Sequence, residues 1–181
     1  MSTTPDDHQI TMIRDQQHRD YLRCLLSMNH EQAREASSLV EEASFCDNWQ
    51  AAKIHAAIIK TVEAGGNEAL LAADVNAVLV ASGELNNPSL HSYWLNLVSP
   101  QDPRPLAAHR ARELAQRINE TAFRELYHRI YSSSNLSTTM ARPLDDLVEL
   151  IADNIDQLRQ AHTKFIARPT LTAVKPEEGA A

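Results

Sequence analysis

Apolar residues recur at helical spacing along most of the chain. Between residues 7 and 28 they stand mainly three or four positions apart, and this stripe predicts one amphipathic helix: Ile10, Ile13, Tyr21, Leu22, Leu25 and Leu26. Shorter stripes of the same period predict further helices along the first half of the chain. Few segments alternate apolar and polar residues as strands do. The pattern therefore predicts an all-α fold that begins with a compact bundle of short helices, residues 7–98.

Residues that cap helices mark the expected boundaries inside this bundle. The side-chain oxygen of Asn or Asp can accept a hydrogen bond from a free N–H of the first helical turn, which makes Asn29, Asp47 and Asp74 the expected N-caps. Asn87 is expected to open another helix, because a proline follows it at the first helical position, where no N–H is needed. Gly65 is expected to end the third helix, since glycine accepts the left-handed backbone that follows many helices.

The pattern changes after a proline-rich hinge. Residues 104–131 predict one long helix, and residues 143–165 predict a second helix whose apolar positions alternate in spacing: Leu144, Val148, Ile151, Ile155, Leu158 and Phe165. Such spacing is typical of a helix paired with a neighbour. With a polar turn between them, the two helices predict an antiparallel hairpin spanning residues 104–165. Residues 1–6 and 166–181 lack helical periodicity and are predicted to be flexible termini.

The composition argues against several functional classes. The 181 residues carry a formal net charge of −7, which disfavours general nucleic-acid binding but leaves room for a local basic patch. Two cysteines make neither a disulfide framework nor a metal site. The polar, acidic start lacks the pattern of a signal peptide, and no apolar run is long enough to cross a bilayer. The simplest expectation is a cytoplasmic protein without a membrane partner.

Catalytic and cofactor chemistry finds no support in the sequence. The eight histidines include no H-E-x-x-H arrangement and no pair four residues apart, so no metal site is expected. The sequence shows no glycine-flanked serine elbow and no carboxylate pair in an apolar setting. Its four glycines do not fit the spacing of a phosphate-binding Walker loop: Gly65, Gly66, Gly83 and Gly179. We therefore expect no catalytic residue, no cofactor and no small-molecule substrate.

Several short segments follow one another in an order found in a known family. They are Phe45 after the second helix, a helix from His55 to Gly65, the run from Asp74 to Leu79 with Gly83-Glu84-Leu85 after it, and Tyr93-Trp94 with Leu97. Followed by the hairpin, this order resembles the N-terminal domain of DnaB-type hexameric replicative helicases over about residues 18–165. The chain departs from that family in the third helix and before the tyrosine, at Trp49, Ile54, His55, Ser89 and Leu90.

The resemblance implies both an architecture and a set of partners. It implies a helical bundle followed by a hairpin, hairpins that pair between subunits, and a layer that receives primase or loader proteins. The RecA-like motor of those helicases is missing, because it needs the Walker loop and a few hundred further residues. The last five residues, Glu177 to Ala181, favour a free-standing protein over a helicase fragment.

Two functional hypotheses follow, and both concern the hairpin. The first is a non-enzymatic interaction module that forms a homodimer or higher homo-oligomer and binds a replication helicase, primase or loader protein. Its partner-binding surface is expected at the apolar positions Leu114, Ile118, Leu126, Val148, Ile151, Ile155 and Leu158. The alternative is a DNA-associated regulatory protein that uses the arginine-rich face of the first hairpin helix: Arg104, Arg110, Arg112, Arg117, Arg124 and Arg129.

The charges and the large aromatic residues leave two choices open. The arginines of the first hairpin helix and the carboxylates of the second form either solvated faces with weak ion pairs or a docking surface; the carboxylates are Asp145, Asp146, Glu149, Asp153 and Asp156. At least one of Trp49, Tyr93 and Trp94 is expected to anchor the core, and an exposed one would suit an interface. The sequence does not decide which of the three that is.

Overall fold

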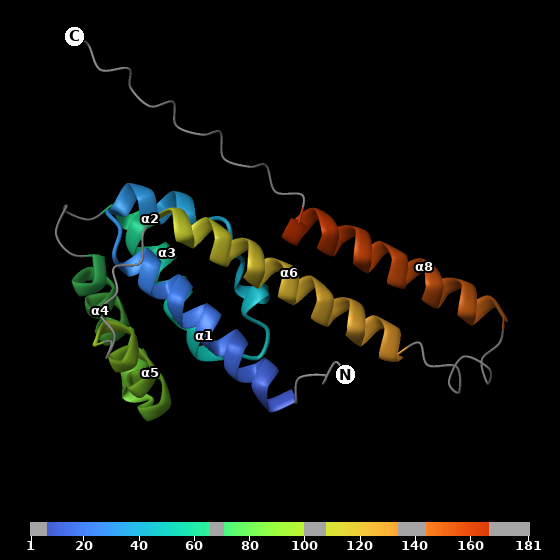
Figure 1. The fold of residues 1–181 in the computed structure, drawn as a ribbon, viewed down its shortest axis with the longest axis horizontal. Coiled ribbons are helices and arrows are strands. Elements are labelled where there is room, and N and C mark those ends of the chain that lie inside the picture. The colour runs from blue at the N-terminus through green and yellow to red at the C-terminus, as the bar shows by residue number, and fades with distance from the viewer. Residues whose placement is uncertain (1–6, 66–70, 100–107, 134–143, 167–181) are drawn as a thin grey trace, which may run out of the picture.

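The computed structural model describes residues 7–65, 71–99, 108–133 and 144–166 (Figure 1). Within these residues the regular structure is helical throughout, which confirms the predicted all-α fold. In chain order the α-helices are α1 (Asp7–Leu26), α2 (His30–Ser37), α3 (Trp49–Ala64), α4 (Leu71–Ala81), α5 (Pro88–Val98), α6 (Ala108–Ser133) and α8 (Leu144–Ala161). The short elements are the 3₁₀ turns η1 (Glu42–Phe45) and η2 (Glu84–Asn86) and the π-helical turn η3 (His162–Ile166).

Two of the predicted caps are confirmed by their hydrogen bonds. The Asn29 side chain accepts from the backbone N–H of Gln32 at 2.9 Å, and the Asn87 side chain accepts from the N–H groups of Ser89 and Leu90. Gly65 follows the last residue of α3 with a φ of 72°, which is the left-handed backbone expected of it.

The other two predicted caps, Asp47 and Asp74, are wrong by a few residues. At α3 the N-cap is Asn48, the residue after Asp47, whose Oδ1 accepts from the N–H of Ala51 at 3.0 Å. At α4 the helix already begins at Leu71, so Asp74 lies in its first turn. There its carboxylate faces His30 Nε2 at 3.2 Å and contributes to packing between helices rather than to capping.

An aromatic cluster forms the centre of the bundle. The Phe45 ring, held by η1, lies 5.2 Å from the His18 ring of α1 and 5.0 Å from the His55 ring of α3, measured between centroids. Tyr21 completes the cluster and donates its hydroxyl hydrogen to the carbonyl of Ala36 in α2. All four rings are fully buried, so this cluster joins α1, α2, α3 and η1 in one core.

Burial keeps both core histidines neutral. Desolvation lowers the pKa of His18 from 6.5 to about 4, and the nearby Arg14 guanidinium acts in the same direction. Desolvation likewise lowers the pKa of His55 to about 4, opposed by a hydrogen bond with the Ser37 backbone. Their apolar surroundings therefore make these residues part of the hydrophobic core at neutral pH.

The first half of α6 belongs to the bundle. Ala111, Leu114, Ala115 and Ile118 are buried in the same core cluster as α1 and α3, and α1 lies along this half of α6 (Figure 1). Buried Asn119 strengthens the attachment, since its amide donates to the carbonyl of Leu39 at 2.8 Å and its Oδ1 accepts from the Ser44 hydroxyl. The first half of α6 therefore contributes to the core of the bundle.

The large aromatics divide between core and surface. Trp94 and Tyr93 are buried, and the Trp94 indole donates to the Asn76 side chain at 3.0 Å. Trp49 is 43% exposed at the start of α3.

The predicted flexible termini lie outside the described residues except for Ile166, which is the last residue of η3. In the described part of the chain, no helix combines the length and the apolar character needed to span a membrane.

Candidate interaction surfaces of the hairpin

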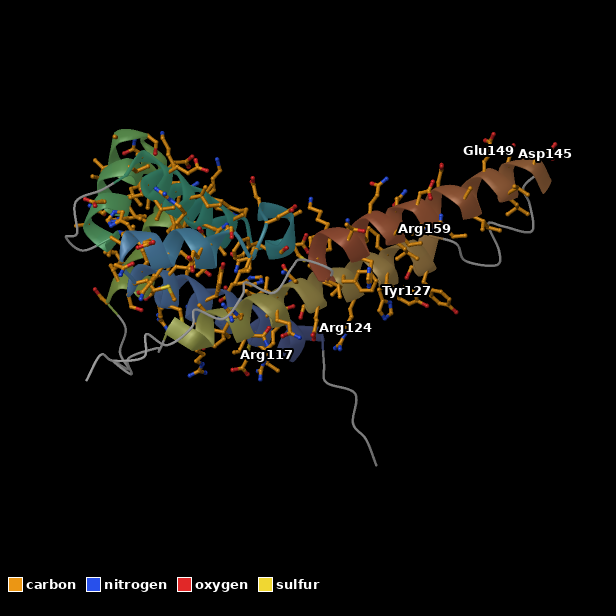
Figure 2. The ribbon with its side chains drawn as sticks, turned by 90° about the horizontal axis from the view of Figure 1, so that it is seen from above. Arg117, Arg124, Tyr127, Asp145, Glu149 and Arg159 are labelled. Atoms are coloured by element: carbon orange, nitrogen blue, oxygen red, sulfur yellow. The ribbon has the colours of Figure 1, made fainter. Side chains whose placement is uncertain are left out.

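The second half of α6 and the whole of α8 run antiparallel beside each other (Figure 1). Phe123 of α6 meets His162, the first residue after α8, edge to face, with ring centroids 6.4 Å apart. Next to His162, Ala161 is buried, and Lys164 Nζ lies 2.6 Å from Glu41 Oε2 at the start of η1. The end of α8 is therefore attached both to α6 and to the bundle, whereas the start of α8 lies at the far end of the hairpin (Figure 2).

Two of the residues predicted to bind a partner belong to the protein's own core. Leu114 is 5% exposed and Ile118 is 1% exposed, because α1, α2 and η1 pack against α6 and bury these positions in the core cluster. In this fold neither side chain is available to another protein. The predicted partner surface therefore narrows to Leu126, which is half-buried, and to the positions on α8.

Helix α8 has two apolar sides. One side is half-buried on α6 and consists of Leu147, Leu150, Leu158 and Phe165. The other consists of Val148, Ile151 and Ile155, which are 61%, 56% and 44% exposed. We call these three residues the apolar strip. They are the members of the predicted partner surface that the structure leaves uncovered.

The position of the apolar strip follows from helical spacing. Ile155 and Ile151 precede His162 by seven and eleven residues, which is about two and three helical turns. The three side chains therefore point to the same side of the helix. Because His162 contacts Phe123, this side adjoins the Phe123 side of α6. The apolar strip therefore lies on an uncovered side of α8 that adjoins α6.

Opposite charges line the two outer edges of the hairpin. Helix α8 carries five carboxylates and one arginine, whereas α6 carries five arginines and three glutamates. Figure 2 shows Asp145 and Glu149 on the outer side of α8, and Arg117 and Arg124 on the outer side of α6. The ion pair of Arg117 joins it to Glu113 of its own helix at 2.7 Å. The hairpin thus has an acidic edge and a basic edge.

The arginines predicted to contact DNA point in different directions. Arg104 lies outside the described residues. Arg110, Arg117 and Arg124 are seven residues apart, which is close to two turns, so they form one line along the exposed side of α6. The other two, Arg112 and Arg129, are each five residues from a member of this line, about 140° around the helix. The structure therefore aligns three of the six predicted residues.

Two tyrosines extend this line and were not predicted as functional residues. Tyr127 and Tyr131 are 51% and 70% exposed, and their rings are nearly parallel, with an interplanar angle of 13° and centroids 6.4 Å apart. Their spacing of four residues predicts neighbouring side chains on a helix. That signal was present in the sequence, but only the structure shows that both rings stay uncovered.

A cleft of about 480 Å³ lies where η1, α6 and the end of α8 meet. Its walls combine apolar and charged side chains, among them Ala43, Cys46, Glu125, Leu126, Arg129, Gln160 and Phe165. Desolvation, followed by a hydrogen bond with Glu125, raises the pKa of Cys46 to about 12, so its thiol stays protonated. Glu125 is itself paired with Arg14 of α1. The one thiol of the cleft is therefore not an activated nucleophile.

Metal ligands do not gather in the described part of the chain, where no group of three His, Cys, Asp or Glu side chains could hold a metal ion.

Comparison with models of known protein families, with curated proteins and with solved structures found no match for this chain.

Proposed function

We propose that the chain is a non-enzymatic protein-interaction module that self-associates through its hairpin and binds a replication protein. The observation that carries this proposal is the exposed apolar strip on a helix whose other side already packs on α6. Burying apolar surface is favourable by about 25 cal/mol per Å², before the cost of association is subtracted. A partner that covers Val148, Ile151 and Ile155 would therefore be stabilised by contacts that the single chain does not make.

A second copy of the chain suits this face because of the charged edges. Two hairpins can meet face to face around a twofold axis parallel to their helices. In that arrangement α6 of one copy lies antiparallel over α8 of the other, and the basic edge faces the acidic edge twice. Turning one copy so that α6 lies on α6 would instead bring arginines together. Charge therefore favours the first arrangement.

The identity of the further partner rests on the resemblance to the DnaB N-terminal domain. The order of bundle and hairpin supports this resemblance, since both parts occur in the sequence in the family's order. We expect the partner to be the replicative helicase, primase or a loader, met in the cytoplasm. By occupying the surface at which such proteins assemble, the chain would assist or block assembly.

Light scattering over a range of protein concentrations tests the self-association. We expect the wild-type chain to be a dimer or larger oligomer, and Ile151→Ala/Ile155→Ala to be a monomer, because each substitution removes about 1–2 kcal/mol of interface burial. Val80→Ala/Leu95→Ala is the matched control, since both residues are exposed apolar positions of the bundle. A wild-type chain that is a monomer throughout, or a double variant of unchanged mass, would refute pairing through the strip.

Binding to purified replication proteins tests the second half of the proposal. Helicase, primase and loader are each immobilised and offered the wild-type chain and the two double variants. Retention by one of them supports the proposal and identifies the partner. If none retains the wild-type chain at micromolar concentration, the replication role is abandoned, whatever the result for self-association.

A further inference from the structure

The line of arginines and tyrosines on α6 has a role that self-association does not require. Arg110, Arg117, Arg124 and Tyr131 follow one another at intervals of seven residues, and Tyr127 lies one turn before Tyr131. At Arg117 and Arg124 this line lies on the outer side of α6 (Figure 2), and the core is formed by other positions of this helix. The line is therefore a surface separate from the apolar strip of α8.

The tyrosine pair has the geometry of a stacking platform. A helix rises about 1.5 Å per residue, so side chains four residues apart in the same rotamer lie about 6 Å apart along the axis. The ring centroids are 6.4 Å apart and the planes are within 13° of parallel. Two nearly parallel rings one helical turn apart can each stack with a base. Both rings are more than half exposed, so their faces can receive planar groups.

The charge around the pair is locally positive. After Glu120, the exposed side of α6 carries Arg124, and the one remaining glutamate of the helix, Glu125, is paired with Arg14 of α1. The acidic residues at the far end of α8 lie on its outer side, away from Arg124 and Tyr127, as Figure 2 shows for Asp145 and Glu149. An anion that approaches the tyrosines therefore meets the Arg124 guanidinium, although the chain as a whole is acidic.

We propose that the face of α6 formed by Arg117, Arg124, Tyr127 and Tyr131 binds short stretches of single-stranded nucleic acid. Bases stack on the two tyrosine rings, and the flanking phosphates lie against the arginines. A duplex does not offer this fit, because its bases are already stacked on one another. Because Arg117 is already paired with Glu113 and Arg124 is the other arginine of this face, binding is weak and confined to a few nucleotides, which agrees with the net charge of −7.

Fluorescence anisotropy of labelled oligonucleotides tests this inference with the full chain. We expect binding of oligo-dT or oligo-rU at low salt, and at least about tenfold weaker binding by Tyr127→Ala/Tyr131→Ala. Tyr127→Phe/Tyr131→Phe keeps the rings and is expected to bind like the wild type. Arg124→Ala is expected to lower the slope of log affinity against log salt by about 0.7, the value for one phosphate contact on a single strand. Arg112→Ala, on another side of the helix, leaves affinity unchanged.

Several outcomes would overturn the inference. These are no binding of either oligonucleotide at low salt, equal binding of a duplex of the same length, or undiminished binding by the double alanine variant. A polyglutamate peptide that competes equally well would show a merely electrostatic surface and would also overturn it. The Ile151→Ala/Ile155→Ala variant is expected to retain oligonucleotide binding, so failure of the self-association proposal and failure of this one are separate results.

Discussion

The bundle and the distal half of the hairpin use the same apolar periodicity with opposite results. In α3, apolar residues three and four positions apart are buried, as Ile54 and Ile58 show. In α8, residues of the same spacing and similar size are exposed, as Ile151 and Ile155 show. The difference lies in the neighbours, because several elements pack around α3, whereas α8 packs on α6 and its continuation η3. Hydrophobic spacing thus predicts a helix and its apolar side, but not whether that side is covered.

This difference has an energetic meaning. Stability in the bundle comes from burial within one chain, so substitutions there change the free energy of unfolding. The exposed side of α8 adds little to folding and is free to contribute to association.

Phe45→Ala is expected to cost the most. It removes the ring that touches His18, Tyr21 and His55 at the centre of the core, and we expect a loss of about 4 kcal/mol in the free energy of unfolding. Urea denaturation followed by circular dichroism measures it. Trp49→Ala, which truncates a partly exposed aromatic of the same bundle, is the control and should cost clearly less. Equal losses would mean that Phe45 does not organise the core.

Lowering the pH is expected to destabilise the same cluster. The folded chain holds the pKa of His18 and of His55 near 4, against 6.5 when unfolded, so the unfolded state takes up protons first. The contribution of each histidine is complete above pH 6.5 and is lost as the pH falls toward 4. From about pH 7 to about pH 5 we expect a loss of about 2 kcal/mol per histidine. Urea denaturation at both pH values measures it, and a flat profile would contradict the assignment.

Ile151→Ala/Ile155→Ala is expected to have the smallest effect on stability. Since both side chains are about half exposed, the double variant should lose less than about 1 kcal/mol at protein concentrations where self-association does not contribute. Leu114→Ala on α6 is the buried counterpart and should lose about 3 kcal/mol. If the α8 variant were the more costly of the two, the strip would belong to the core and the contrast between the regions would fail.

The parts of the fold that depend on local sequence could be predicted, and those that depend on distant neighbours could not. The caps at Asn29 and Asn87 involve residues within one turn, so the sequence pattern was sufficient. Asp47 was predicted as the N-cap in place of Asn48, because the side-chain oxygen of either residue type can accept the capping hydrogen bond. The burial of Leu114 and Ile118 depends on the packing of α1 and η1 on α6, and both elements lie far away in the sequence.

The candidate site shows the same limit. The exposed positions Val148, Ile151 and Ile155 were predicted as a partner surface from their spacing. The sequence did not distinguish them from Leu158, which has the same periodicity but is half-buried. Nor did it place Tyr127 beside Tyr131 with both rings uncovered, because exposure is decided by the packing of α8 on α6.

The placement of the two tryptophans has a practical consequence for spectroscopy. Trp49 and Trp94 are the two tryptophans of the chain, and both belong to the bundle. Trp49 is partly exposed and Trp94 is buried. Tryptophan fluorescence will therefore report the unfolding of the bundle. It will not change when the distal half of the hairpin unfolds or binds a ligand. A dye or an introduced indole on that half would be needed to observe those events by light.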